Sequence, residues 1–354
     1  MTKFPPRMVL VISTPLEFNL VERIRQVAPD RVEVRYVPDL LPTPRYPADH
    51  SGPPDYRRSA RDEKRWRELI ASADILWDIP PRRADGSNAI DDAKKLRWVQ
   101  TTSSGVGPLV KKLKLIERGI EVTTARGLHA GPLTEFVFLA LLMHAKGLLR
   151  MQKEQAAHHW EYTCSGTLEG KTLAIVGLGG IGRRIAATGK QFGMTVAGLL
   201  RPGVTGRPEE FGIDAPFEAE AFHEMLATSD ALVLCAPHTP DTHRMLDRAA
   251  FDALKPGAVL INIARGTLVD EAAMIAALRS GKLAFAALDV FDTEPLPPES
   301  PLWDMDNVLV SPHSASTVAT ENERIVEVFC HNLPLFLDGR IDAMRNRFHA
   351  DRGY

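Results

Sequence analysis

A glycine-rich turn between an apolar strand and a helix constrains the fold of this chain more than any other feature. The apolar run TLAIV at 172–176 predicts a strand, and GLGGIG follows it at 177–182. Ile181, Ile185 and Phe192 then recur at the spacing of one helix face. A strand, this glycine pattern and a helix in succession are typical of a dinucleotide-binding turn.

Each position of the turn has a specific use in that interpretation. Gly177 permits the tight turn, Gly179 lets the backbone approach a pyrophosphate, and Gly182 lets the helix pack closely on the strand. Gly180 and Ile181 begin the helix, where free amides and the positive end of the helix dipole suit phosphates. We therefore predict a dinucleotide site at this turn.

Apolar strands alternate with helices on both sides of the turn. From residue 172 onward we predict strands at 172–176, 195–200, 231–236, 259–263, 284–290 and 307–311. They are almost continuously apolar, as strands buried on both faces must be, which favours a doubly wound parallel sheet. The first third repeats the pattern and predicts a second, smaller α/β domain with strands at 8–13, 32–37, 75–79, 97–102 and 120–125.

Three further segments bear on the organisation of the chain. The proline-rich segment 39–56 has no periodicity and is either a loop that covers a cleft or a loose excursion. The segment 133–151 is apolar nearly all round, which indicates a helix in a subunit interface or a central helix within the monomer. The amphipathic helix predicted at 321–339 could cross back to the first domain.

Composition excludes several classes of protein. The chain has 354 residues, enough for two domains, with 44% hydrophobic residues, 25% charged residues and a net charge of −2. No charged block indicates nucleic acid or membrane as a partner, and the three separated cysteines form no disulfide framework or zinc cluster. The histidines of 158–160 and 238–243 lack partners at metal-ligand spacing, so we predict no metal site. The apolar run near the start is too short for a signal peptide, and we expect a cytoplasmic protein.

Ligands of a doubly wound sheet lie beyond the carboxyl ends of its strands, where three polar residues are placed. Arg265 follows strand 259–263, Glu294 follows strand 284–290, and His313 follows strand 307–311. Each taken alone could be a solvated surface residue. Their joint placement at successive strand ends favours hydride transfer to a 2-keto acid.

The residue types suit that chemistry. Hydride addition leaves negative charge on the carbonyl oxygen, and His313 can give the proton in reduction and accept it in oxidation. Glu294 on the other ring nitrogen would fix the tautomer and favour the imidazolium. Arg265 offers a planar fork to the substrate carboxylate and can polarise the carbonyl.

We expect the remaining ligand contacts at other strand ends. Ser104 and Gly105, in the segment 99–109, could bind a substrate carboxylate through their amides, or this segment could be an ordinary helix cap. Asp289 could accept a hydrogen bond from the nicotinamide carboxamide. The other cofactor contacts are expected from residues in and after the later strands, namely Cys235, Pro237, Thr242, Ile263 and Ala264, with Arg265 and His313.

The end of strand 195–200 bears on the choice of dinucleotide. Proteins that bind NAD usually end this strand with an acid that holds the ribose 2′-hydroxyl, whereas here Leu200 and Arg201 stand. Arg201 can bind the 2′-phosphate of NADP, with Arg207 within reach and Glu209 and Glu210 opposing it. Arg201 could instead stack over adenine or point to solvent. We predict NADP as the cofactor, with NAD as the alternative.

Three motifs resemble the D-isomer-specific 2-hydroxyacid dehydrogenase family: GLGGIGRRIA, LINIARGTLVDEAAMIAAL, and AALDVFDTEPLPPESPLW followed by NVLVSPHSAS. The resemblance implies a Rossmann coenzyme domain, 126–319, inserted into a flavodoxin-like substrate domain, 1–125 and 320–354, with the active site in the cleft between them. It implies Arg265, Glu294 and His313 as catalytic residues, carboxylate binding near Ser104 and Gly105, and a homodimer joined through the coenzyme domains.

The leading hypothesis is therefore a 2-keto acid reductase, or D-2-hydroxyacid dehydrogenase, whose particular acid the sequence leaves open. A formate- or phosphite-type dehydrogenase is an alternative, although formate enzymes resembling this family pair their histidine with glutamine rather than with a residue such as Glu294. A dinucleotide-sensing corepressor or scaffold on the same fold is a second alternative. The sequence shows neither an interaction tail nor a lost catalytic residue to support it.

Overall fold

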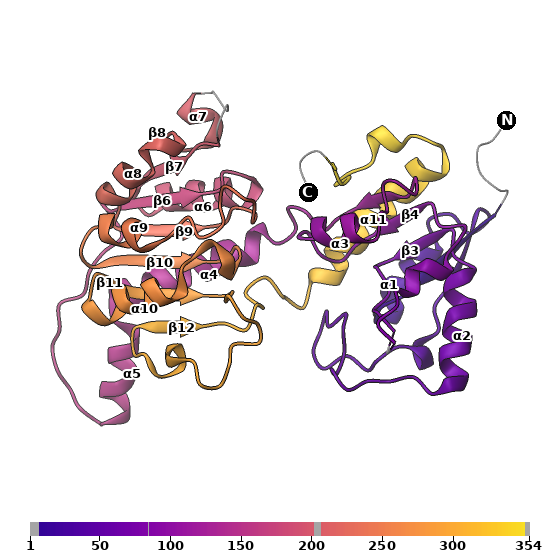
Figure 1. Ribbon diagram of the computed structural model, residues 1–354, viewed down its shortest axis with the longest axis horizontal. Coiled ribbons are helices and arrows are strands. Elements are labelled where there is room, and N and C mark those ends of the chain that lie inside the picture. The colour runs from indigo at the N-terminus through magenta and orange to yellow at the C-terminus, as the bar shows by residue number, and fades with distance from the viewer. Residues whose placement is uncertain (1–6, 84, 202–206, 351–354) are drawn as a thin grey trace. The chain divides into compact units, whose positions relative to one another are not determined.

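In the computed structural model, which describes residues 7–83, 85–201 and 207–350, the chain folds into two compact α/β units (Figure 1). Unit 1 comprises Met1–Leu128 and Thr317–Tyr354, and unit 2 comprises His129–Ser316. Unit 2 is therefore inserted into the sequence of unit 1. The domain boundaries expected from the sequence, at 125/126 and 319/320, lie about three residues from these divisions and stay a prediction.

Unit 1 is built on a five-stranded parallel sheet in the order β2-β1-β3-β4-β5, which is the flavodoxin-like order. Its strands are β1 Met8–Ile12, β2 Val32–Arg35, β3 Ile75–Trp77, β4 Trp98–Gln100 and β5 Glu121–Thr123. Its helices cover both faces, with α1 Phe18–Arg25 and α11 Glu321–Leu337 on one face and α2 Ala60–Ala71 and α3 Gly107–Lys112 on the other. The sheet is doubly wound, as predicted.

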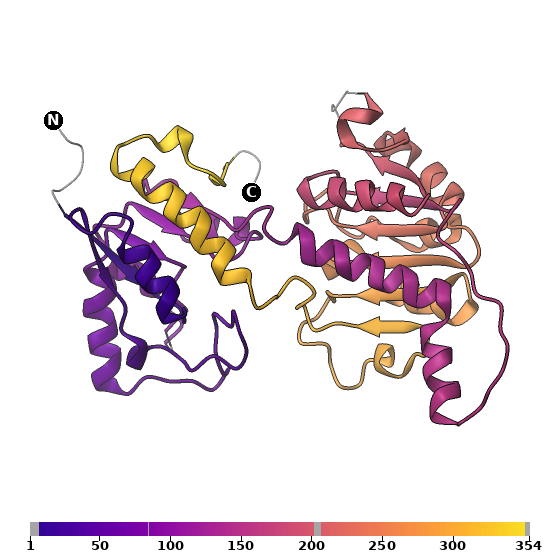
Figure 2. The same ribbon diagram turned by 180° about the vertical axis from the view of Figure 1, so that it is seen from behind.

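Helix α11 completes the core of unit 1 although it comes last in the chain. Phe329 of α11 stacks on the buried indole of Trp98, with ring centroids 4.7 Å apart, and meets Trp77 edge-on at 5.7 Å. Such aromatic contacts add to the free energy gained by burying the rings. The amphipathic helix predicted at 321–339 thus does return to the first domain, as Figure 2 also shows.

Unit 2 contains a seven-stranded parallel sheet in the order β12-β11-β10-β9-β6-β7-β8. From β8 to β11 this is the Rossmann order, extended by one more strand. Its strands are β6 Thr172–Val176, β7 Thr195–Leu199, β8 Ala215–Phe217, β9 Ala231–Leu234, β10 Ala258–Asn262, β11 Leu283–Leu288 and β12 Val308–Val310.

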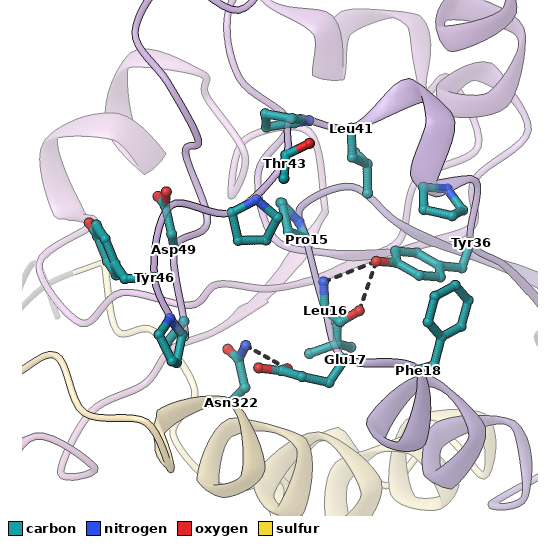
Figure 3. A pocket seen from close by; sticks show the side chains of 15 residues that line it. Pro15, Leu16, Glu17, Phe18, Tyr36, Leu41, Thr43, Tyr46, Asp49 and Asn322 are labelled. Carbon is teal, nitrogen blue, oxygen red and sulfur yellow. Dashed lines mark hydrogen bonds between the residues drawn. The ribbon is translucent and has the colours of Figure 1, made fainter.

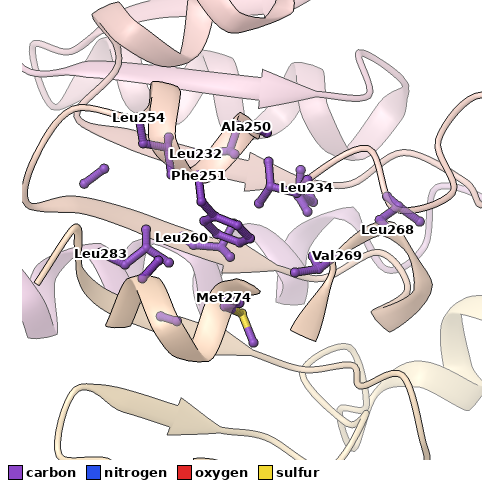
Figure 4. Packing of buried hydrophobic residues seen from close by; sticks show 14 of the residues in the cluster. Leu232, Leu234, Ala250, Phe251, Leu254, Leu260, Leu268, Val269, Met274 and Leu283 are labelled. Carbon is purple, nitrogen blue, oxygen red and sulfur yellow. The ribbon is translucent and has the colours of Figure 1, made fainter. Parts of the chain in front are cut away.

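Helices cover both faces of this sheet and give two buried apolar layers. The helices of unit 2 are α4 Ala130–Lys146, α5 Leu148–Ala156, α6 Gly180–Gln191, α7 Pro208–Phe211, α8 Phe222–Thr228, α9 Arg248–Ala253 and α10 Glu271–Ser280. Helices α8, α9 and α10 pack on one face, where Phe251 lies among strand leucines and Met274 (Figure 4). Helices α4 and α6 pack on the other face.

Two elements differ from the sequence-based prediction. Strand β8 was not predicted, because it is a short edge strand with Pro216 at its centre, and edge strands tolerate proline. The segment 133–151 is not one helix, since Gly147 adopts the left-handed conformation (φ 66°) that ends α4 before α5 begins.

The buried face of α4 belongs to the core of unit 2, where Val137, Phe138 and Leu141 pack against the sheet. This supports the interpretation of α4 as a central helix, while Leu139 on its other side is exposed. Among the described residues, no single helix has the length and apolar character needed to cross a membrane. The consecutive pair α4 and α5 meets that test only jointly, with a bend of 61° between them.

Candidate active site

The glycine turn after β6 is crowded on its inner side and open on its outer side. Gly177 has a φ of 107°, and a Cβ there would lie 2.6 Å from the backbone nitrogen of Ala236. A Cβ at Gly182 would lie 2.0 Å from the carbonyl oxygen of Gly177, so neither position admits a side chain. Gly179 and Gly180 are exposed, and a Cβ on either would meet nothing within 4 Å. The turn thus leaves room for a phosphate at the start of α6, and it fits a dinucleotide.

The segment after β7 presents a basic side chain and no acid at the expected ribose position. Leu200 is buried and its amide donates to the Phe217 carbonyl at 2.7 Å, whereas Arg201 is exposed. Residues 202–206, which come next in the sequence, lie outside the described residues. Beyond them, Arg207 forms an exposed ion pair with Glu210 at 3.3 Å.

Arg183, which the sequence-based interpretation passed over, lies beside the same turn. Its Nε donates to the carbonyl of Leu178 at 3.1 Å and its Nη1 donates to that of Glu210 at 3.0 Å. The guanidinium thus connects the glycine turn to α7. The only signal in the sequence was its place directly after Gly182, since the contact with α7 depends on the tertiary fold.

The loop after β9 lies against the glycine turn and is closed by its own side chains. Cys235 donates its thiol proton to the Gly177 carbonyl at 3.0 Å, and burial raises the pKa of Cys235 to about 12, so it stays a thiol. Thr242 donates to the Pro237 carbonyl at 2.9 Å and accepts from the Thr239 amide at 2.8 Å. Three of the residues predicted to bind the cofactor, Cys235, Pro237 and Thr242, therefore lie in one hydrogen-bonded loop beside the glycine turn.

Three adjacent parallel strands, β10, β11 and β12, are each followed by a residue for which the sequence suggests a catalytic or cofactor-binding role. The last residues of these strands are in register, pairing Asn262 of β10 with Leu288 of β11 and Leu288 with Val310 of β12. Arg265, Asp289 and His313 all follow these positions closely. They therefore emerge at one edge of the sheet, the edge at which doubly wound folds bind ligands.

His313 and Glu294 are in direct contact. Nδ1 of His313 lies 2.8 Å from Oε2 of Glu294, while Oε1 of Glu294 accepts a hydrogen bond from the Phe291 amide at 3.0 Å. The carboxylate is thus fixed at both oxygens, and because it can only accept, Nδ1 of His313 carries the proton in this contact. Nε2 of His313 makes no hydrogen bond with any described residue. His313 also has a φ of 51°, a conformation that non-glycine residues adopt rarely and mostly under tertiary constraint.

Asp289 holds the turn that carries His313. Its Oδ1 accepts hydrogen bonds from the Ser311 hydroxyl at 2.6 Å and from the Ser314 and Ala315 amides at 2.9 and 3.0 Å. Burial raises the pKa of Asp289, and these three hydrogen bonds oppose that rise. The sequence suggested a contact with the nicotinamide carboxamide, but the structure shows a different use for Oδ1 and leaves only Oδ2 for such a contact.

Arg265 stands on a loop shaped by the buried side chain of Asn262. Oδ1 of Asn262 accepts from the Ala264 amide at 3.1 Å and its Nδ2 donates to the Arg265 carbonyl at 3.1 Å. Ile263 and Ala264 are buried, while Arg265 is exposed and donates through Nη1 to the Ala264 carbonyl at 2.6 Å. A Cβ on Gly266 would lie 1.9 Å from a backbone carbon of the loop after β11, which explains the glycine following the arginine.

In unit 1, Ser104 and Gly105 lie between β4 and the short helix α3, and their amides donate to no acceptor among the described residues. The preceding loop is held by Asp78, whose Oδ2 accepts from the Thr102 hydroxyl at 2.8 Å. Asp78 itself has a φ of 67°, and its carbonyl accepts from the Ser13 hydroxyl at 3.0 Å. The sequence-based interpretation missed Asp78, because its role depends on contacts between strand ends.

Two histidine-containing segments have closer neighbours than their sequence spacing indicated. Glu154, His159 and Glu161 place possible ligand atoms within 4.8 Å of one another, although the group is largely exposed. Nε2 of His238 lies 3.1 Å from Nδ1 of His243. The first group contradicts the expectation that the histidines of 158–160 lack partners at metal-ligand spacing, and the absence of a metal site stays a prediction.

A family model and a protein of known name are both similar in sequence to this chain. Residues 138–315 match the family model described as "D-isomer specific 2-hydroxyacid dehydrogenase, NAD binding domain". The chain is 33% identical over 280 residues to a glyoxylate reductase of Korarchaeum cryptofilum, covering 77% of this chain and 82% of that protein.

The solved structures that resemble this chain include members of the same family. A D-isomer-specific 2-hydroxyacid dehydrogenase family protein from Aeromonas salmonicida aligns with a TM-score of 0.76 at 31% identity, covering 98% of this chain and 100% of that one. A D-isomer-specific 2-hydroxyacid dehydrogenase from Xanthobacter autotrophicus, in complex with NADPH and MES, aligns with a TM-score of 0.72 at 28% identity, with the same coverage.

Proposed function

The chain belongs to the D-isomer-specific 2-hydroxyacid dehydrogenase family of NAD(P)-dependent oxidoreductases, and from that premise we propose that it reduces a small 2-keto acid to the D-2-hydroxy acid with NADPH. The nicotinamide, when bound, supplies the hydride. The single observation that best supports this proposal is the contact between His313 and Glu294 at the carboxyl edge of the sheet in unit 2.

The remaining chemistry falls to side chains of this protein. His313, with its proton on Nδ1 held by Glu294, gives a second proton from Nε2 to the developing alkoxide. Arg265 binds the substrate carboxylate and polarises the adjacent carbonyl through its planar guanidinium. The amides of Ser104 and Gly105 are proposed to bind the same carboxylate from unit 1. Asp289 positions His313 by fixing the turn around it.

Substitution of Glu294 by glutamine tests the observation that supports the proposal. Reduction requires the imidazolium of His313, so kcat/KM for reduction should fall at high pH, where the ring no longer carries the second proton. The carboxylate stabilises the imidazolium, and the neutral amide does not, so the falling limb of the Glu294→Gln variant should lie at lower pH. The oxidation profile should shift in the same direction.

The pH–rate profiles of wild type and variant in both directions provide the measurement. Glu299→Gln, a change in an exposed glutamate of the same loop region, serves as the matched control and should leave the profile in place. An unchanged limb in Glu294→Gln would remove Glu294 from its proposed role.

We further propose that NADPH is preferred over NADH. Leu200 offers no acceptor to the ribose 2′-hydroxyl and no repulsion to a 2′-phosphate, and Arg201 stands exposed beside it. Arg183 adds a second guanidinium close to the glycine turn. The related protein from Xanthobacter autotrophicus was solved with NADPH, which supports the same choice.

The double substitution Leu200→Asp with Arg201→Ser should abolish this preference. A hydrogen bond to a charged group contributes about 1.5–3 kcal/mol, which corresponds to roughly 10- to 100-fold in kcat/KM for NADPH. The ratio of kcat/KM with NADPH to that with NADH measures the effect. Arg279→Ser, on the exposed side of α10, is the control and should keep the wild-type ratio. A wild type that prefers NADH would contradict the proposal.

We also propose a homodimer formed through the α4–α5 side of unit 2. Large apolar side chains are exposed there, notably Trp160 at 85% and Tyr162 at 91%, with Leu139 and Met151 about half exposed. The rings of Trp160 and Tyr162 meet edge-on with their centroids 6.4 Å apart. Large exposed apolar groups that gather in this way mark interaction surfaces. The double variant Trp160→Ser with Tyr162→Ser should shift the mass in solution from that of a dimer to that of the 39.1 kDa chain. Trp303→Ser, another exposed tryptophan, should remain dimeric, and a wild type of 39.1 kDa would refute the proposal.

A further inference from the structure

Unit 1 contains a pocket that no step of the proposed reaction uses. It has a volume of about 310 Å³ and lies at the carboxyl ends of β1 and β2. One wall is the proline-rich segment 39–56, another is the chain from Pro15 to Phe18, and Asn322 at the start of α11 forms the floor as seen in Figure 3. Three segments far apart in sequence thus enclose one space.

The proline-rich segment 39–56 is held together by its own hydrogen bonds and packing contacts, which argues against the alternative of a loose excursion. Arg45 binds Asp49 through two hydrogen bonds of 2.7 and 3.0 Å, and Asp49 also accepts from the amides of Ser51 and Gly52. These hydrogen bonds hold the pKa of Asp49 well below its usual range. Gly52 packs directly on the ring of Pro42, where a Cβ would lie 2.2 Å from the proline Cβ. The segment is therefore held by its own side chains and forms one wall of the pocket.

The charge of the pocket is that of one carboxylate. The fifteen lining residues include two acids and no lysine, arginine or histidine. Asp49 is neutralised by Arg45, whereas Glu17 pairs with no cation among the described residues. An incoming group therefore meets a single uncompensated negative charge, which belongs to Glu17.

Glu17 and Asn322 each present the pocket with a side-chain oxygen that has no hydrogen-bond donor among the described residues. Oε2 of Glu17 accepts from Nδ2 of Asn322 at 2.9 Å, and its Oε1 has no partner among the described residues. Asn322 is 2% exposed, and its Oδ1 is buried without a hydrogen-bond partner among them. The Tyr36 hydroxyl is already used, donating to the Leu16 carbonyl at 2.7 Å and accepting from the Leu16 amide at 3.2 Å. The Thr43 hydroxyl, which also lines the pocket, can donate or accept, but the free oxygens of Glu17 and Asn322 can only accept and therefore favour a ligand that brings N–H groups.

The rest of the lining is apolar and aromatic. Phe18 and Tyr46 line the pocket yet remain 68% and 47% exposed, and several prolines complete the walls. A carboxylate among aromatic rings favours a cation, because the rings attract positive charge and the carboxylate accepts its N–H groups. A neutral ligand would leave the charge of Glu17 unpaired.

We propose that this pocket binds the ammonium or guanidinium group of a small molecule, with the cation on Glu17 and its alkyl chain against the prolines and aromatic rings. Asn322 acts as a positioning residue that holds Glu17. The cation could belong to a free ligand or to the far end of a 2-keto acid substrate, since the pocket and the amides of Ser104 and Gly105 share one edge of the sheet. The site itself does not depend on the proposed reaction.

Binding of butylguanidinium and of butylurea, measured by isothermal titration calorimetry on the full chain without cofactor, tests the proposal. The two probes have nearly the same shape, and only the first is charged. Wild type should bind butylguanidinium at least tenfold more tightly than butylurea. Glu17→Gln should lose that difference while keeping its contact with Asn322. Because the Glu17 side chain caps no backbone amide of α1, the substitution should leave the helix and the melting temperature unchanged.

The matched control is Glu22→Gln, on the same helix and paired with Arg25 at 3.4 Å. This variant should bind butylguanidinium as wild type does. Equal affinity of wild type for the two probes, no binding of either, or unchanged discrimination in Glu17→Gln would each overturn the proposal.

A kinetic experiment then distinguishes the two sources of the cation. If the cation is part of the substrate, kcat/KM for 2-oxo-5-guanidinopentanoate should exceed that for 2-oxopentanoate, and Glu17→Gln should remove the excess. If the ligand is separate, the two acids should react equally while butylguanidinium still binds. Failure of all turnover would contradict the proposed function but not the site, which the calorimetry tests separately.

Discussion

Replacement of His313 by alanine is expected to lower kcat for 2-keto acid reduction by roughly 10²–10⁴-fold, the range typical of removing a general acid. The variant loses the only proton donor proposed for the alkoxide, while the glycine turn and the loop after β9 are untouched. NADPH affinity, measured by the fluorescence of the bound nucleotide, should therefore stay at the wild-type value. Steady-state kinetics at a pH where reduction is fastest gives the comparison.

The fold of unit 2 must survive this substitution for the result to be meaningful. His313 adopts a left-handed conformation that an alanine also adopts with difficulty, but the turn is held by Asp289 through neighbouring amides. His223→Ala, an exposed histidine on α8, is the matched control and should retain full activity. A His313→Ala variant with near-wild-type kcat would show that another group supplies the proton.

Substitution of Arg265 by alanine is expected to lower kcat/KM by roughly 10²–10³-fold, as when a donor to a developing oxyanion is removed. Both kcat and KM should change, because the guanidinium is proposed to bind the carboxylate and to polarise the carbonyl. Arg265→Lys should fall between the alanine variant and wild type, since it keeps the charge but loses the planar fork.

Added guanidinium ion should partly restore the activity of Arg265→Ala, which a merely structural defect would not allow. Arg248→Ala, an exposed arginine on α9, is the matched control. A change in KM alone, with kcat intact, would restrict Arg265 to binding and remove its part in polarising the carbonyl.

Much of the fold could be predicted because the decisive signals are local. Near-continuous apolar runs locate the central strands, and a glycine turn between strand and helix identifies the first βα unit. Strand β8 escaped prediction because three residues around Pro216 carry no periodicity and are paired only through β7. The break between α4 and α5 at Gly147 was not predicted, because the apolar pattern continues across it. Only the backbone conformation of Gly147 ends α4 there.

The residues proposed as catalytic could be predicted from the sequence, but the residues that hold them in position could not. Arg265, Glu294 and His313 could be found because topology brings strand ends to one edge, and the structure shows His313 against Glu294. The roles of Asn262 and Asp289 could not be found, since each depends on amides of a loop whose path the sequence does not specify. The pocket beside Glu17 joins three distant segments and leaves no local pattern at all.

Turnover of a panel of 2-keto acids by wild type with NADPH tests the central claim most directly. Glyoxylate, hydroxypyruvate, pyruvate, branched and aryl keto acids, and 2-oxo-5-guanidinopentanoate span small, bulky and cationic side chains, with formate and phosphite tested in the oxidative direction. We expect NADPH-dependent reduction of at least one keto acid to the D-2-hydroxy acid, identified by chiral chromatography, and no oxidation of formate or phosphite. A protein that binds NADPH yet turns over none of the keto acids would contradict the account and favour a dinucleotide-sensing role.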